Sequence, residues 1–122
     1  MQFTESQAIY LQIAKIIEEK ILRMEWAAEE RIPSVRDLAV NMEVNPNTVA
    51  RTYETLQQKE MIYNKRGIGY FVSEKACSII QKEWKKNFQE QDLPEFFKTI
   101  SLLDFSMDEI NILYEQYNEK TQ

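Results

Sequence analysis

The sequence predicts a mainly α-helical fold with one small β-hairpin, which places the protein in the α+β class. Three observations predict this fold. Apolar residues recur every three or four positions over 6–24, two short segments within 34–60 each begin with a capping residue, and two β-rich runs flank a glycine-containing turn within 61–72. We therefore expect a first domain at 1–74 and a short helical tail at 75–122.

Composition narrows the classes of function. The chain has 122 residues, of which 43% are apolar and 29% are charged, a balance that is typical of globular proteins. Cys77 is the one cysteine and histidine is absent, so an internal disulfide, the usual zinc sites and histidine-based catalytic triads are excluded. We expect a protein that is not an enzyme and that needs neither a metal nor a cofactor.

The sequence carries no signal for a membrane or for secretion. No apolar run approaches the roughly 18 residues that span a bilayer. The start of the chain, Met-Gln-Phe-Thr-Glu, lacks the basic-then-apolar order of a secretory signal. We expect a cytoplasmic protein with no membrane partner.

The net charge of −5, taken alone, argues against nucleic-acid binding, because phosphate contacts need basic side chains. The charge is unevenly distributed, however. Residues 1–75 carry ten Lys and Arg against eleven Asp and Glu (net −1), whereas residues 76–122 carry five against nine (net −4). Affinity for a nucleic acid would therefore have to come from a local basic patch in the first part of the chain.

The first expected helix, over 6–24, is amphipathic. Its apolar stripe consists of isoleucines at helical spacing: Ile9, Ile13, Ile16, Ile17 and Ile21. Isoleucine is a mediocre helix former, so packing rather than propensity should stabilise this helix. Trp26 follows it and is expected to cover one end of the core.

A second helix is expected directly after Pro33, which disfavours helix at the residue before it. Ser34 with Asp37 three residues later resembles a capping box. Arg36 lies in the first turn, where the helix dipole does not favour a cation. An ordinary surface arginine would fit this position, but an arginine held where a phosphate can approach explains it better.

A third helix is expected to begin at Pro46, with Asn45 as its N-cap. Its inward face consists of residues at i, i+4 and i+7: Val49, Tyr53 and Leu56. Asn47, Thr48 and Arg51 lie elsewhere on its surface. Two short helices separated by about three residues match a helix-turn-helix, whose second helix contacts base edges through its N-terminal residues. These residues alone fit equally well a capped helix on an ordinary surface.

The following segment decides between these two interpretations. The runs 61–64 and 70–72 are typical of strands, and the turn between them contains Lys65, Arg66 and Gly67. A basic hairpin tip suits a wing that reaches phosphates or the minor groove. A phosphate loop is disfavoured because the third glycine of that motif is missing. The sequence thus predicts a winged helix-turn-helix that binds DNA.

Three ordered motifs, at 33–39, 44–53 and 67–72, resemble the GntR-type winged-helix repressors of bacteria. The resemblance covers residues 8–73. The resemblance implies a dimeric transcription factor, and the short tail is similar to the YtrA-type subgroup, in which a small helical tail mainly pairs two chains.

The sequence departs from the family pattern at several positions. Glu29 and Glu60 stand where glycine is usual, and Ile32 stands where leucine is usual. Of these, Glu60 puts in doubt the sharpness of the end of the third helix, though not the fold. Pro46 and Ala50 occupy positions that are frequently basic in the family. Base reading would therefore depend on the polar residues that remain: Asn45, Asn47, Thr48 and Arg51.

The tail is expected to form three short helices. Ser73 can cap the first, Asp92 with Pro94 indicates a second start, and 106–109 has the pattern of a capping box. So small a unit cannot hide all its apolar side chains, and we expect these residues to form a dimer interface: Ile80, Trp84, Phe88, Phe96, Phe97, Ile100, Ile110, Leu113, Tyr114 and Tyr117. Packing of the tail on its own first domain, and a pocket for an unidentified small-molecule effector between subunits, are the alternatives.

The sequence as a whole predicts a DNA-binding transcriptional regulator, a repressor, that binds a pseudo-palindromic operator as a homodimer. The residues expected to face DNA are Ser34, Arg36, Asn45, Pro46, Asn47, Thr48, Arg51, Lys65, Arg66 and Gly67. A winged-helix module that binds proteins and not DNA is the alternative that the acidic net charge favours.

Overall fold

The computed structural model describes Phe3 and residues 7–121. Its internal contacts divide the chain into two compact units, Met1–Glu83 and Trp84–Gln122, and each is described here by itself. The fold is mainly helical with one two-stranded antiparallel hairpin, which confirms the predicted fold class. In the described part of the chain, no helix has the length and apolar character needed to cross a bilayer.

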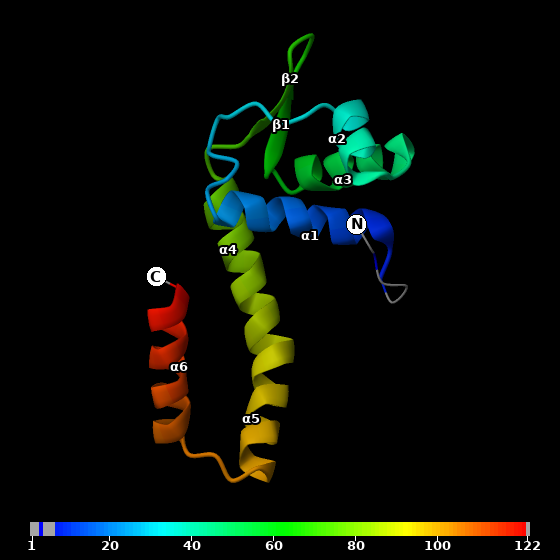
Figure 1. Ribbon diagram of the computed structural model, residues 1–122. Helices are drawn as coiled ribbons and strands as arrows, with labels where there is room; N and C mark the ends of the chain where they lie inside the picture. Colours follow the sequence, from blue (N-terminus) through cyan, green and yellow to red (C-terminus); the bar gives the residue numbers. More distant parts are fainter. Residues whose placement is uncertain (1–2, 4–6, 122) are drawn as a thin grey trace. The chain divides into compact units, whose positions relative to one another are not determined.

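The first unit is a winged helix-turn-helix (Figure 1). Its elements are α1 (Ile9–Leu22), α2 (Val35–Met42), α3 (Pro46–Gln58), β1 (Ile62–Lys65), β2 (Gly69–Val72) and the first part of α4 (Ala76–Asn87). The expected helix over 6–24 is therefore shorter at both ends, and Ser6 lies outside the described residues. One core joins these elements through side chains that are at most 2% exposed: Ile13, Ile17, Ile21, Val49, Tyr53, Leu56, Met61, Val72 and Ile80.

The position of Ile80 corrects one expectation. The sequence places Ile80 in a dimer interface, but in the structure its side chain is completely buried in the first unit. Ala76, one turn earlier on α4, is also completely buried. The salt bridge between Lys59 Nζ and Glu83 Oε1, 2.8 Å long, ties this part of α4 to the residue that follows α3. The apolar stripe of α4 thus begins by completing the core of the first unit.

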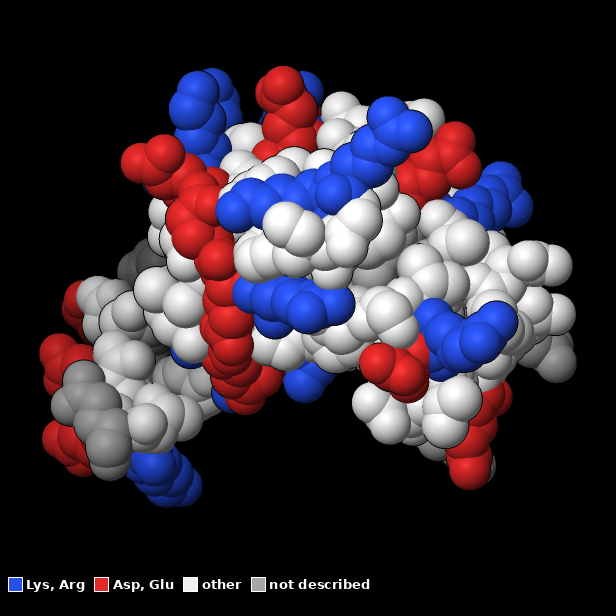
Figure 2. Space-filling view, turned by 90° about the horizontal axis from the view of Figure 1, so that it is seen from above, with Lys and Arg blue, Asp and Glu red and all other residues white. Residues whose placement is uncertain are grey.

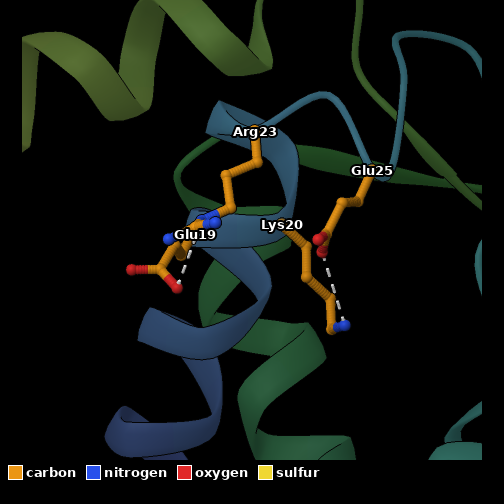
Figure 3. Close-up of polar contacts among 4 residues, drawn as sticks. All are labelled: Glu19, Lys20, Arg23 and Glu25. Carbon is orange, nitrogen blue, oxygen red and sulfur yellow. Dashed lines mark ion pairs between the residues drawn. The ribbon is translucent and has the colours of Figure 1, made fainter. Parts of the chain in front are cut away.

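The charged residues at the end of α1 pair with one another (Figure 3). Arg23 Nε lies 3.6 Å from a Glu19 carboxylate oxygen, and Lys20 Nζ lies 3.7 Å from a Glu25 carboxylate oxygen. All four side chains are at least 39% exposed, so each pair stabilises the fold by no more than about 1 kcal/mol. These two cations therefore belong to local ion pairs at the C-terminal end of α1.

The end of α3 is sharp although glycine is absent there. Glu60 adopts a left-handed conformation with φ of 62°. Its N–H donates to Gln57 O, and the Met61 N–H donates to Leu56 O, both at 3.0 Å. This pair of bonds is the Schellman closure, which usually places glycine at the left-handed position. The doubt about the end of the helix is thereby resolved, because the hydrogen bonds form in spite of the backbone strain at Glu60.

We expect Glu60→Gly to stabilise the protein. A left-handed residue with a Cβ costs about 1–2 kcal/mol, and the greater freedom of unfolded glycine takes back about 0.5–1 kcal/mol. The free energy of unfolding in urea should therefore rise by up to about 1.5 kcal/mol. The matched control is Glu54→Gly, at an exposed position inside α3. This substitution should lower the free energy of unfolding by roughly 0.5 kcal/mol. Equal losses from both substitutions would show that Glu60 stores no strain.

The wing is larger than the hairpin alone. In the hairpin, Ile62 pairs with Val72 and Lys65 pairs with Gly69. The segment before α2, for which the sequence gives no periodicity, lies along the other side of β2. Arg31 forms an antiparallel bridge with Phe71, and hydrogen bonds of 2.8–3.0 Å connect this segment to β2 on both sides of the bridge. The loop that leads into α2 is therefore fixed to the wing.

The second unit consists of the end of α4, a π-helical turn η1 (Phe88–Asp92), α5 (Leu93–Leu102) and α6 (Met107–Thr121). The expected new start at Asp92 is wrong. Asp92 is itself helical (φ −78°, ψ −42°), and its side chain makes no capping bond. Pro94 lacks an N–H and crowds the carbonyl four residues before it, and the wider π turn accommodates it without a break.

The other two helix starts of the tail agree with the sequence. Ser73 Oγ accepts a hydrogen bond from the Lys75 N–H at 3.1 Å, just before α4. At the start of α6 the capping box is complete. The Glu109 N–H donates to Ser106 Oγ at 3.1 Å, and the Ser106 N–H donates to Glu109 Oε1 at 3.2 Å.

Candidate nucleic-acid interface

The N-terminus of α3 forms as predicted and faces solvent. The Asn45 side-chain oxygen accepts the Asn47 N–H at 2.8 Å, and Pro46 occupies the first turn. Asn45, Pro46 and Asn47 are exposed, and Thr48 is half-buried. Because the cap occupies the oxygen of Asn45, its amide N–H groups are what this side chain can offer to an acceptor on DNA.

Two buried hydroxyl groups fix α3 in place. Tyr53, which is completely buried, donates its hydroxyl to Pro33 O at 2.6 Å, and its ring meets the Tyr70 ring edge-on at 4.9 Å. Burial raises the pKa of the Tyr53 phenol, which therefore stays protonated and remains a donor. Thr52, also completely buried, donates to Tyr10 O at 2.8 Å. These bonds connect α3 to the segment before α2 and to α1.

Arg51 lies on the exposed surface of α3, but its side chain is not isolated. The guanidinium carbon lies 3.9 Å from the centre of the Tyr10 ring, which comes from the first turn of α1. The sequence singled out Arg51 but gave no role to Tyr10. No local pattern connects two residues so far apart in the chain, so only the folded structure reveals the pair.

The start of α2 presents the remaining helix residues of the predicted site. Ser34 Oγ accepts the Asp37 N–H at 3.1 Å, which confirms Ser34 as the N-cap. Arg36 lies in the following turn and is exposed. An exposed arginine beside free backbone N–H groups at a helix start suits an anion such as phosphate.

The wing tip carries the last three predicted residues: Lys65, Arg66 and Gly67. All three are exposed. Gly67 has φ of 80°, which a side chain rarely adopts, and the turn closes with a bond from the Ile68 N–H to Lys65 O at 2.9 Å. Lys65 Nζ lies over the Phe71 ring, 4.6 Å from its centre. The tip extends beyond α2 and α3 in Figure 1.

Arg31 is a wing residue that sequence reasoning missed. Its guanidinium packs directly against Gly69, so that a Cβ at that glycine would lie 3.0 Å from Arg31 Nε. Arg31 is exposed and adds a cation to the strand pair that carries Lys65. The sequence gives no signal for this contact, because it depends on pairing between residues that are almost forty positions apart.

We expect Gly69→Ala to destabilise the wing for two separable reasons. The residue has φ of 145°, and the added methyl group would collide with Arg31. The free energy of unfolding should fall by more than about 1 kcal/mol in urea titrations. Gly67→Ala is the matched control, since it has strained φ but nothing within 4 Å of its new Cβ. The double variant with Arg31→Ala and Gly69→Ala should be more stable than Gly69→Ala alone, because the added methyl group no longer meets the guanidinium. Equal stabilities would show that the collision with Arg31 does not contribute to the loss.

The charges of this face are mixed. In the view from above, Lys and Arg side chains lie in several groups with Asp and Glu side chains between them (Figure 2). Binding would therefore rely on individual, well-placed cations and not on one broad basic field. Within the described part of the chain, no three Asp, Glu or Cys side chains gather into a possible metal site.

Comparisons with known proteins agree with this geometry. Residues 9–72 match the family of bacterial regulatory proteins called the gntR family. The HTH-type transcriptional regulator YhcF of Bacillus subtilis (strain 168) is 37% identical over 109 residues, which cover 89% of this chain and 88% of YhcF. The HTH-type transcriptional repressor YtrA of the same organism is 38% identical over 86 residues, covering 70% of this chain and 66% of YtrA.

A solved structure extends the similarity to the second unit. The crystal structure of a GntR-family transcriptional regulator from Bacteroides thetaiotaomicron has a TM-score of 0.74 and 43% identity, and it covers 94% of this chain and 100% of that chain. The matched family segment nearly coincides with the 8–73 expected from the motifs. The chain therefore belongs to the GntR family and is a DNA-binding transcriptional regulator built on a winged helix-turn-helix.

Proposed function

We propose that this regulator is a repressor that binds a pseudo-palindromic operator as a homodimer. The observation that carries the proposal is the exposed, capped start of α3, where Asn45, Asn47 and Thr48 cluster beside Arg51. A helix-turn-helix reads base edges in the major groove with this part of its second helix. The repressor role is supported by the similarity to YtrA, which is named a repressor.

We assign the residues to three kinds of contact. Arg36, with the N-terminus of α2 that Ser34 caps, would bind phosphate and fix the register. The polar residues of α3 would approach base edges, with Arg51 suited to the O6 and N7 acceptors of guanine. The wing residues Lys65, Arg66 and Gly67 would contact phosphates or the minor groove.

The homodimer is supported by the composition of the second unit. In residues 84–121 no side chain is buried, although many of them are apolar. Exposed large apolar residues of this unit are Phe88, Phe96, Phe97, Leu102, Leu103, Phe105, Met107, Ile112, Leu113, Tyr114 and Tyr117. Trp84, Ile100 and Ile110 are half-buried. A second copy of the chain would cover such a surface, and a two-fold pair would supply two recognition helices to symmetric half-sites.

DNA binding can be tested by fluorescence anisotropy with labelled duplexes from the region upstream of the protein's own gene. A shuffled duplex of equal length and composition is the control. We expect tighter binding to one upstream duplex, with affinity that falls as salt rises. Footprinting of that duplex should reveal two inverted half-sites. Equal binding to both duplexes, or no salt-sensitive binding, would favour the protein-interaction module that the acidic net charge also fits.

The oligomeric state can be tested independently by sedimentation equilibrium. The full chain should sediment at twice the mass of 14.6 kDa. Phe97→Asp, at an exposed apolar position of α5, should shift the protein toward monomer, whereas the neighbouring Lys98→Asp should not. A wild-type monomer at micromolar concentration would refute the homodimer. A small-molecule effector remains a hypothesis to which we attach no residue.

A further inference from the structure

We infer that Tyr10 is a positioning residue for DNA recognition and that it holds the Arg51 guanidinium ready to contact DNA. The inference rests on the proposed function, because it presupposes that Arg51 reaches DNA. It concerns a residue of α1, which otherwise contributes to the fold through its buried isoleucines. The argument depends on how Tyr10 is fixed and on what its ring does to Arg51.

The geometry of the pair is that of a cation stacked on an aromatic ring. Arg51 Cζ lies over the Tyr10 ring at 3.9 Å from the centroid, well within the range of about 6 Å in which such contacts are favourable. Tyr10 is half-buried and Arg51 is exposed. One face of the guanidinium is therefore covered by the ring, while the side chain as a whole remains open to solvent.

Tyr10 is itself held by the recognition helix. The hydroxyl of Thr52 donates to Tyr10 O at 2.8 Å and also lies 3.1 Å from Thr48 O. Thr52 is the next residue after Arg51 and is completely buried. The main chain that carries the Tyr10 ring is thus hydrogen-bonded to α3 at the residue next to Arg51, so the start of α1 cannot shift relative to Arg51 without breaking this bond.

Stacking suits an arginine that reads DNA. A free arginine side chain populates many rotamers and loses that freedom when it binds. A ring beneath the guanidinium restricts these rotamers in advance, yet it leaves the N–H groups in the guanidinium plane able to donate. Two such parallel donors are what a bidentate contact to guanine or phosphate requires. Preorganisation of this kind raises affinity by lowering the entropy lost on binding.

A ring that blocks Arg51 and a ring that positions it would change DNA affinity in opposite directions, so the sign of the change decides between these two roles. If the ring kept Arg51 away from DNA, removal of the ring would strengthen binding. If the ring positions Arg51, its removal weakens binding to the operator and has little effect on random DNA. Because the contact is exposed, we expect a loss of roughly 3- to 10-fold for the operator.

The experiment measures binding of full-length variants to the footprinted upstream duplex and to its shuffled control, over a series of salt concentrations. Tyr10→Leu removes the ring and should weaken operator binding roughly 3- to 10-fold, with less than about a 2-fold change on shuffled DNA. Tyr10→Phe keeps the ring and is the matched control, with an expected change within about 2-fold. Tyr10→Trp offers a better cation partner and should bind the operator at least as tightly as the wild type.

A double-mutant cycle separates positioning from a general role in folding. In an Arg51→Ala background, Tyr10→Leu should cause no further loss of operator binding. A similar loss in both backgrounds, or tighter binding by Tyr10→Leu, would overturn the inference. If Tyr10→Leu does not fold, as judged by circular dichroism, weaker binding by the folded Tyr10→Trp variant would overturn it instead. A wild type that does not distinguish the two duplexes would refute the proposed function itself, which is a different outcome.

Discussion

Ile80→Ala is expected to lower the free energy of unfolding by about 2–5 kcal/mol, the range for large-to-alanine substitutions in a packed core. Ile80 has no exposed surface and closes the core of the first unit from α4. Its truncation removes apolar contacts and leaves a cavity that the fixed helices fill only in part. Urea unfolding of the full chain, followed by circular dichroism at several protein concentrations, measures the change.

The matched control for Ile80 is Ile9→Ala, the same substitution at a residue of α1 that is 44% exposed. That change should stay within about 0.5 kcal/mol, as is usual for surface positions. The comparison also tests the corrected role of Ile80. A small effect on unfolding, together with a shift from dimer to monomer, would restore Ile80 to the interface that the sequence alone suggests.

Arg51→Ala should produce the largest loss of sequence-specific binding among the predicted contacts. Removal of an arginine that makes a bidentate contact to guanine costs about 1–3 kcal/mol, which is roughly 5- to 150-fold in affinity. Affinity for the operator should fall more than affinity for shuffled DNA, so the protein's preference for the operator should decrease. Anisotropy titrations of both duplexes at matched salt measure it.

Lys65→Ala serves as the comparison, because a phosphate contact from the wing carries no sequence information. It should weaken binding to operator and shuffled DNA by the same factor and reduce the salt slope by about one. If Arg51→Ala and Lys65→Ala had equal effects on both duplexes, the separation into base-reading and phosphate-binding residues would be wrong.

Helix starts were predictable because capping is local. Ser34, Asn45 and Ser106 each bond to a backbone N–H two or three residues later, so a short stretch of sequence contains everything that the cap needs. The same reasoning failed at Asp92. There the side chain and proline are typical of a helix start, but the preceding helical backbone continues through a π turn.

Helix ends were harder to predict than helix starts. Glutamate replaces the usual glycine at position 60, at the end of α3, and at position 29, in the loop before α2, and both residues adopt the left-handed conformation that glycine would favour. Burial of Met61 and two backbone hydrogen bonds hold Glu60 in this conformation. Packing thus overrides the local preference of a single residue, which no count of propensities reveals.

The sequence by itself determined the order of the helices, the capped recognition helix, the hairpin and the family. The helices and the hairpin follow from periodicity and from side chains that act within one helical turn, whereas the family follows from the resemblance of three ordered motifs. Only the tertiary structure decided that Arg31 packs on Gly69, that Tyr10 stacks on Arg51, and that Ile80 belongs to the core. Each of these contacts joins residues far apart in the chain, and their proximity depends on how the elements pack together.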